Sequence, residues 1–263
     1  MHKLFLGIDR STYQIEFKKI CEIAENFGFD GIELQPEHPD IFKIYPFKAV
    51  SFVNDILSNY KFEISFHTPI KDLNISSYNK NIRKFSINQI KESIEFAKKI
   101  KAKYIVTHGG KNSFKTTSSF SKKCEKIALN STIDALTSFY DICSDNGLTL
   151  SVENMSYSDW RMTSKIKYLE RIFQEIPDLK LTLDIDHAIL RSKNYVDKFI
   201  EVFNRKLISS HIGLIKNYKF YLKKLLKLSN LKFFVLEPHS YFISPNIIKI
   251  IKDNINELKK LIK

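Results

Sequence analysis

Short apolar runs alternate along the chain with longer segments in which apolar residues recur at helical spacing. Segments 16–28, 83–100 and 124–147 repeat apolar residues at i, i+3, i+4 and i+7, as does segment 246–263, which is typical of amphipathic helices. The apolar runs between such segments have the length and composition of buried strands. They lie at residues 4–8, 31–35, 62–66, 104–108, 148–153, 179–184, 207–212 and 232–237. The pattern therefore predicts eight strands, each followed by a helix.

The spacing of these strands indicates the fold class. One strand–helix unit takes about 33 residues between Ile8 and Glu237, and a chain of 263 residues suits a barrel of eight such units. The strands are rich in Ile, Val, Leu and Phe without strict alternation, which favours a parallel sheet covered by helices. We predict an α/β fold, a (β/α)8 TIM barrel, over residues 1–263 as one domain. A doubly wound sheet is the alternative, but no GxGxxG motif follows the first strand.

Six successive predicted strands end on or next to an acidic or imidazole side chain. These residues are His67, His108, Glu153, Asp184 with His187, His211 and Glu237. The carboxyl ends of barrel strands lie on one face, so we expect the side chains to meet at one rim. Mixed imidazole and carboxylate sets bind divalent cations such as Zn, Mn, Mg or Co. The sequence predicts a divalent metal centre there, in which Glu153 and Glu237 also transfer protons.

Each of these residues also has a structural explanation when it is taken alone. Glu153 and Glu237 could form ion pairs with the abundant lysines, and His67 and His108 could be hydrogen-bonded histidines without a ligand. An unpaired charge at the end of a buried apolar run would cost free energy because it loses its hydration, and this favours a functional site. Asp186, inside the Asp-Ile-Asp-His segment, is predicted to cap the next helix or to hold the neighbouring histidine in one tautomer.

Further candidates for substrate contacts follow the second and fifth strands. Glu33 either faces the site or bonds to Asp9 and Arg10, which themselves form a structural ion pair or a contact at the rim. Trp160 and Arg161 come shortly after the fifth strand, and an aromatic ring beside a cation suits a sugar or a sugar phosphate. The same two residues could equally form a packed loop corner.

The charge of the chain limits which partners are expected. Lys and Arg number 42 against 29 Asp and Glu, a net charge of +13. Only six of the cations are Arg, whereas a surface that reads bases would use more of them. Most lysines fall at helical spacing and suit solvated helix faces. A positive field that attracts phosphate groups is the other interpretation.

The three cysteines and the hydropathy of the chain bear on its compartment. Cys21, Cys124 and Cys143 form no CxxC pair, which favours reduced thiols and a cytoplasmic protein. The apolar run near the N-terminus is shorter than a signal peptide requires. No apolar stretch of 18 residues is present, so we expect no membrane partner.

The order and spacing of several motifs resemble the xylose-isomerase-like TIM-barrel superfamily. The motifs are GIDRST, GIELQ, SFHTP, IVTHGG, SVENM, LTLDIDHA, SSHIG and VLEP. For a sugar isomerase or epimerase of this superfamily, the resemblance implies one metal ion held by Glu153, Asp184, His211 and Glu237. It implies that the two glutamates act as acid and base, and that His187 contacts a small-molecule sugar or sugar phosphate.

The motifs also resemble the endonuclease IV enzymes of the same superfamily, which cut DNA at abasic sites. That resemblance implies zinc ligands at His67, His108, Glu153, Asp184, His187, His211 and Glu237. Two further ligands, from an Asp-x-His motif after the seventh strand, are absent from IGLIKNYKFYLKK, and Ile70 stands where a tyrosine is expected. A phosphodiesterase with a reduced metal centre, acting on nucleic acid, is therefore the less favoured alternative.

A third interpretation is a barrel that binds a metal or a ligand without catalysis. Its basis is the short connection between the seventh and eighth strands. The resemblance places a substrate-binding arginine in this connection, and Lys216 is the only nearby cation in this chain. Lys216 is accordingly a candidate for the substrate contact.

Overall fold

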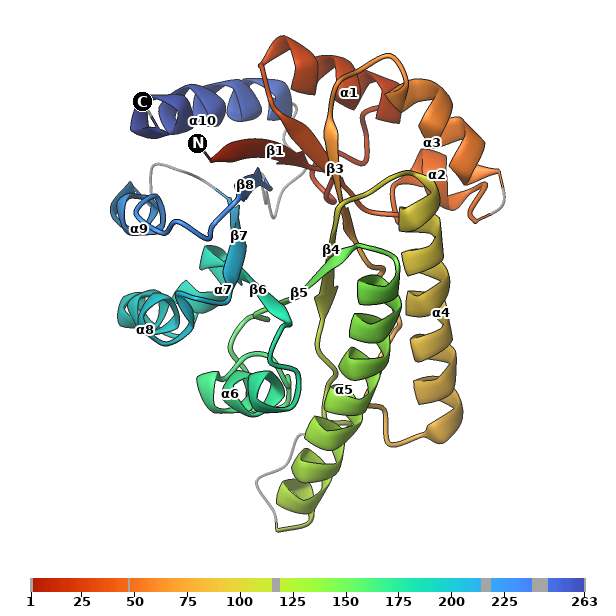
Figure 1. Ribbon diagram of the computed structural model, residues 1–263, viewed down its shortest axis with the longest axis vertical. Coiled ribbons are helices and arrows are strands. Elements are labelled where there is room, and N and C mark those ends of the chain that lie inside the picture. The colour runs from red at the N-terminus through yellow and green to blue at the C-terminus, as the bar shows by residue number, and fades with distance from the viewer. Residues whose placement is uncertain (1, 47, 115–118, 214–218, 238–245, 263) are drawn as a thin grey trace.

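The computed structural model describes residues 2–46, 48–114, 119–213, 219–237 and 246–262. Eight parallel strands pair in the order of the sequence and close into a barrel when the eighth pairs with the first (Figure 1). The strands are β1 (Lys3–Gly7), β2 (Gly31–Leu34), β3 (Glu63–His67), β4 (Tyr104–His108), β5 (Thr149–Glu153), β6 (Lys180–Asp184), β7 (Leu207–Ile212) and β8 (Phe233–Leu236). The predicted (β/α)8 TIM barrel is confirmed.

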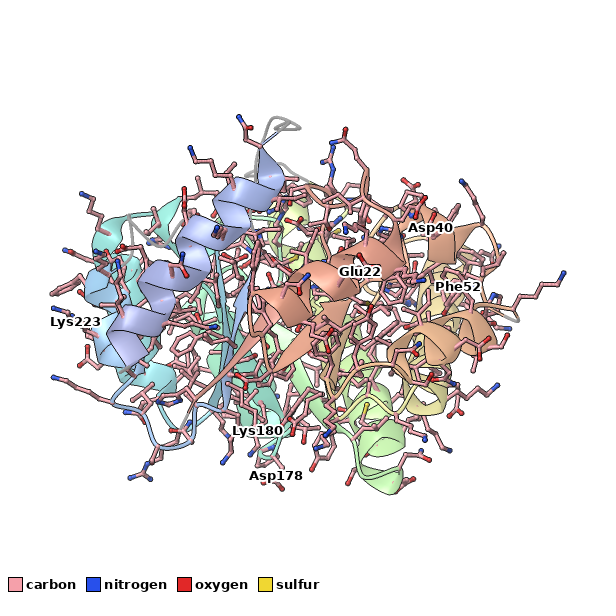
Figure 2. All side chains as sticks on the ribbon, turned by 90° about the horizontal axis from the view of Figure 1, so that it is seen from above. Glu22, Asp40, Phe52, Asp178, Lys180 and Lys223 are labelled. Carbon is pink, nitrogen blue, oxygen red and sulfur yellow. The ribbon has the colours of Figure 1, made fainter. Side chains whose placement is uncertain are left out.

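Helices connect the strands and surround the barrel. They are α1 (Phe17–Asn26), α2 (Pro39–Phe42), α3 (Ala49–Leu57), α4 (Lys80–Lys99), α5 (Ser119–Asp145), α6 (Ile166–Glu175), α7 (Ile185–Ile189), α8 (Lys193–Phe203), α9 (Lys219–Leu225) and α10 (Ile247–Ile262). Their apolar faces pack on the outer face of the strands in the main core. Exposed lysines such as Lys223 extend from the outside of this ring (Figure 2).

The start of α5 differs from the prediction. The helix begins at Ser119, five residues before the predicted residue 124. Residues 119–123 read Ser-Phe-Ser-Lys-Lys, and this polar stretch has no apolar periodicity that would indicate a helical turn. The first turn of α5 therefore left no hydrophobic pattern in the sequence.

The inside of the barrel is filled in layers, because alternate side chains of each strand point inward. Near the amino ends of the strands, the stacked rings of Phe5 and Phe233 lie 4.5 Å apart at their centres. The next layer contains hydroxyls: Ser151 Oγ lies 2.7 Å from Thr182 Oγ1, which lies 2.8 Å from Ser209 Oγ. These buried groups satisfy one another and form a polar layer directly below the rim.

No helix within the described ranges has both the length and the apolar composition that a membrane crossing requires. The three cysteines are buried and unbridged.

Candidate metal centre

Glu153, the last residue of β5, is the centre of the candidate site. Its side chain is 2% exposed, and four imidazoles surround its carboxylate. Nε2 of His67 and Nε2 of His108 each lie 3.1 Å from Oε2. Nδ1 of His187 lies 3.1 Å from Oε1, and Nδ1 of His211 lies 3.4 Å from Oε2. Side chains from the ends of four strands and from α7 thus meet at one carboxylate.

A short helix turns His187 toward this carboxylate. Asp184 ends β6 and caps α7, because its Oδ1 accepts a hydrogen bond of 2.7 Å from the backbone N–H of His187. Nδ1 of His187 is 2.9 Å from the carbonyl oxygen of Asn154 and 3.2 Å from Oδ2 of Asp184. A proton on Nδ1 therefore faces oxygen atoms, and Nε2 is the nitrogen left for a ligand.

His211 is held between three carboxylates. Its Nδ1 lies 3.4 Å from Oε2 of Glu153 and 3.4 Å from Oε2 of Glu237. Its Nε2 lies 2.9 Å from Oε1 of Glu33, whose Oε2 accepts a hydrogen bond of 2.6 Å from Ser65 Oγ. Glu33 is fully buried and is placed to fix the orientation of the His211 ring, so that Nδ1 faces the two catalytic candidates.

The donor atoms fall into three groups whose members lie within 4.8 Å of one another. The groups are His67, His108 and Glu153; Glu33, His211 and Glu237; and Glu153, Asp184 and His187. The four residues that the resemblance implies for a single metal ion are divided between the last two groups, which the contact between His211 and Glu153 joins. The structure thus brings all seven predicted ligands to one rim.

The donor set fits a divalent metal. Both ring nitrogens of His108 and of His211 are buried without a hydrogen bond to any described residue, although carboxylates lie within 3.4 Å. A buried polar atom without a hydrogen bond costs about 1–3 kcal/mol. A cation between imidazole nitrogens and carboxylate oxygens would satisfy both kinds of atom.

Charge coupling shifts the titration of the cluster. Burial raises the pKa of Glu153, but the charges of His108 and His211 outweigh this effect and hold that pKa well below its usual value. Burial lowers the pKa of His67, yet the carboxylate of Glu153 raises it to about 9. Burial likewise lowers the pKa of His187, yet the carboxylates of Asp184 and Glu153 raise it to about 9. Without a metal, protonated imidazoles therefore balance the buried carboxylates.

The pKa values of two further histidines of the cluster shift in opposite directions. The pKa of His211 is raised well above its usual value, because the carboxylates of Glu237 and Glu33 overcome the effect of burial. The pKa of His108 is lowered, because burial outweighs its attraction to Glu153.

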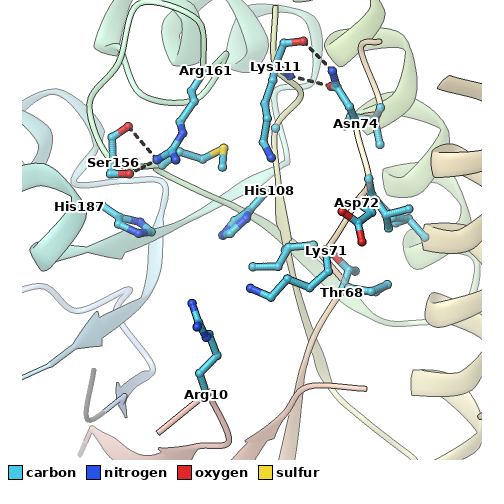
Figure 3. Close-up of a pocket in the computed structure, with 17 residues that line it drawn as sticks. Arg10, Thr68, Lys71, Asp72, Asn74, His108, Lys111, Ser156, Arg161 and His187 are labelled. Atoms are coloured by element: carbon cyan, nitrogen blue, oxygen red, sulfur yellow. Dashed lines mark hydrogen bonds between the residues drawn. The ribbon is translucent and has the colours of Figure 1, made fainter. Parts of the chain in front are cut away.

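A cavity of about 520 Å³ opens beside the cluster (Figure 3). His108, His187 and Arg161 line it. The guanidinium carbon of Arg161 lies 5.0 Å from the centre of the Trp160 ring. Trp160 itself is not among the described residues that line the cavity. The predicted substrate contact at Lys216 falls outside the described residues.

The structure shows the surroundings of the three candidates near the first two strands, Glu33, Arg10 and Asp9. Of the two options for Glu33, the structure shows the one that faces the site, with contacts to His211 and Ser65. Arg10 lines the cavity. Oδ1 of Asp9 accepts a hydrogen bond of 2.9 Å from the backbone of Ser11 in its own loop.

Two supporting contacts were assigned wrongly or missed by sequence reasoning. Asp186 was predicted to cap a helix or fix His187, but Asp184 is the cap, and Asp186 Oδ2 accepts a 2.9 Å hydrogen bond from the backbone of Gly213. Asn154 was missed. Its side chain exchanges hydrogen bonds of 2.8 and 2.9 Å with the backbone of Asp184 and thereby joins the ends of β5 and β6. An amide directly after a buried strand-ending glutamate was the available signal.

A family model and a known protein match the sequence of this chain. The model of a family described as "Xylose isomerase-like TIM barrel" matches residues 21–220. The uncharacterized protein MJ1614 of Methanocaldococcus jannaschii is 35% identical over 159 residues, which cover 60% of this chain and 58% of that protein. This chain therefore matches little more than half of the length of that relative.

Solved structures share the fold over nearly the whole chain. A D-tagatose 3-epimerase-like protein superposes with a TM-score of 0.79 at 20% identity, covering 99% of this chain and 98% of that one. The IolI protein, solved with a zinc atom bound, gives a TM-score of 0.73 at 15% identity, covering 98% and 96%. At these identities the likeness establishes the fold.

The raised histidine pKa values predict how the stability of the metal-free protein depends on pH. The unfolded chain binds these protons with a pKa near 6.5, whereas His67 and His187 hold them up to about 9 in the folded state. The stabilisation is fully present below pH 6.5 and is lost as the pH rises through 9, by roughly 3 kcal/mol for each histidine at most. Urea unfolding in a chelator at pH 6 and pH 9 measures it. Replacement of His67 by Asn should flatten the dependence, and a wild-type stability that is constant over this range would contradict the assignment.

The contact between Glu33 and His211 predicts a loss of metal affinity without loss of fold. Glu33→Gln removes the charge that orients the imidazole, so zinc affinity, measured by competition with a chromophoric chelator, should fall by about 10–100-fold. Glu63→Gln is the matched control, because Glu63 begins the next strand and pairs with Lys3 and Lys103 at the other end of the barrel. Equal affinities in both variants, with equal unfolding free energies, would show that Glu33 does not position His211.

Proposed function

The chain belongs to the xylose isomerase-like TIM-barrel family, and from this we propose that it is a divalent-metal-dependent isomerase or epimerase that acts on a sugar or a sugar-like polyol carbonyl. Among the solved structures with the same fold are epimerases of several sugars, which supports an enzyme of this family. The metal is Zn, Mn, Mg or Co, because each of them accepts mixed imidazole and carboxylate ligands.

One observation carries the proposal. Oε2 of Glu153 and Oε2 of Glu237 lie at the same distance, 3.4 Å, from Nδ1 of His211. Glu153 ends β5 and Glu237 directly follows β8, and β6 and β7 lie between these two strands in the closed barrel. Two carboxylates from different sides of the rim thus lie close to one imidazole nitrogen, Nδ1 of His211.

This arrangement suits proton transfer on both sides of one carbon atom. A divalent metal held by Glu153, Asp184, His211 and Glu237 would polarise a carbonyl oxygen and acidify the adjacent C–H group. One glutamate takes the proton from that carbon, and the other returns a proton. Return to the opposite face of the same carbon inverts it. Return to the former carbonyl carbon isomerises the sugar, provided that the hydroxyl of the first carbon gives its proton to the former carbonyl oxygen.

His187 has the position to orient the substrate. Its Nδ1 faces the carbonyl oxygen of Asn154, and its side chain lines the cavity. Nε2 is thus the nitrogen that can contact a substrate oxygen. Burial of Glu153 and Glu237, which are 2% and 4% exposed, keeps bulk water away from the proton-transfer groups.

Proton exchange tests this function directly. The metal-loaded protein, incubated with ketoses and their phosphates in deuterated water, should exchange the hydrogen next to the carbonyl, as followed by NMR. Glu153→Gln and Glu237→Gln should each slow the exchange by about a thousandfold, because each removes an acid–base group. Glu170→Gln, on the exposed face of α6, should exchange at the wild-type rate. Absence of exchange with every sugar and every metal would count decisively against the proposal.

A second candidate is hydrolysis of a phosphodiester at an abasic site in DNA. The group formed by His67, His108 and Glu153 favours it, because it offers a further metal site beside the first. A labelled duplex with one abasic site, incubated with the protein in saturating zinc, decides between the two. Cleavage that depends on His67 and His108 would support the hydrolase, and an intact duplex removes it.

A further inference from the structure

Positive side chains surround the cavity beside the metal centre. Arg10, Lys71, Lys111 and Arg161 line it, each from the loop after a different strand, β1, β3, β4 or β5. Asp72 is the one carboxylate among its described lining residues. Figure 3 shows the four cations around the space next to His108 and His187. Positive side chains therefore outnumber negative ones among the described residues that line the cavity, which favours an anionic ligand.

Backbone hydrogen bonds hold two of these cations opposite one another. Lys111 and Arg161 are paired in an isolated antiparallel bridge between the loops after β4 and β5. The backbone N–H of Asn112 donates to Trp160 at 2.7 Å, and that of Met162 donates to Gly110 at 2.9 Å, on either side of the bridge. Like charges directly opposite one another are unfavourable, and an anion between them would reduce this repulsion.

The loop after β3 fixes the same bridge from the other side. The side chain of Asn74 accepts a hydrogen bond of 2.8 Å from the backbone N–H of Lys111 and donates one of 2.9 Å to its carbonyl oxygen. Ser76 Oγ donates to the same carbonyl at 3.1 Å. Lys111 is therefore part of a built frame, unlike the solvated lysines on the outer helices.

Arg161 has no carboxylate partner within the ranges that the structure describes. Its guanidinium donates to the carbonyl and the hydroxyl oxygen of Ser156, and its Nε is buried without a hydrogen bond. Burial lowers the pKa of this guanidinium, because no nearby negative charge offsets its lost hydration. An anion in the cavity would supply both the charge and the missing acceptor.

We propose that the substrate is a phosphorylated sugar, whose phosphate group binds between Lys111 and Arg161 while its carbonyl end reaches the metal centre. This inference rests on the proposed isomerase function. Lys71 and Arg10, both exposed, approach from the opposite wall and complete the neutralisation of a dianion. The cavity volume of about 520 Å³ suits a small molecule. The four cations surround this one cavity, whereas a polynucleotide would need an extended row of positive charges.

Binding of inorganic phosphate tests the subsite separately from catalysis. Calorimetric titration of the metal-loaded protein should give a Kd that rises at least about tenfold in Arg161→Gln and in Lys111→Gln. Arg171→Gln is the matched control, since Arg171 lies on the exposed surface of α6 and pairs with Glu175. A Kd that is equal in wild type and in both cavity variants would assign the phosphate to the metal alone and overturn the subsite.

Kinetics then separates this inference from the proposed function. In the proton-exchange assay, kcat/KM for a ketose phosphate should exceed that of the matching free ketose by about 100-fold, and this ratio should fall at least about tenfold in Arg161→Gln. Free and phosphorylated sugars that exchange equally fast would overturn the inference and leave the isomerase in place. A preference for the matching sugar carboxylate, or cleavage of the abasic duplex, would overturn it as well.

Phosphate binding that depends on Arg161 and Lys111, in a protein that exchanges no sugar proton, would uphold the anion subsite and remove the isomerase reaction.

Discussion

A buried negative charge on Glu153 is the constraint on which the candidate site depends. A carboxylate at 2% exposure is stable only when opposite charges or a metal compensate its lost hydration. Four imidazoles from β3, β4, β7 and α7 provide this compensation, and each must come to a defined place at the rim. The geometry of the rim is therefore fixed by electrostatics as much as by packing.

The layer under the rim explains why such a polar site is tolerated. Residues two positions before a predicted ligand at the rim also face inward, and several of them carry a small hydroxyl, as Ser65, Ser151, Thr182 and Ser209 do. Ser65 donates to Glu33, and the other three join one another across three strands. Small hydroxyls leave volume for the large ligands above them and extend the hydrogen-bond network downward.

Much of the fold and of the rim could be predicted because both leave a local signal. Strands with buried apolar residues and ligands at their carboxyl ends are contiguous in sequence, so His67 or Glu153 could be placed without coordinates. The contacts that these residues make with one another could not be predicted in this way. The contact of Glu33 with His211 joins positions 178 residues apart, and the bridge between Lys111 and Arg161 joins two loops whose separation no periodicity encodes.

The barrel closes where the first strand meets the last. β1 pairs with β8, and a Cβ atom on Gly7 would lie 2.6 Å from Cγ of Glu237, so the glutamate of the last strand fills the space that the first strand leaves open. Glu237 thus takes its place in the candidate site only when the first and last strands of the barrel pair. If the candidate site binds a divalent cation as proposed, a partly folded chain should not bind it tightly, and cation binding would report completed folding.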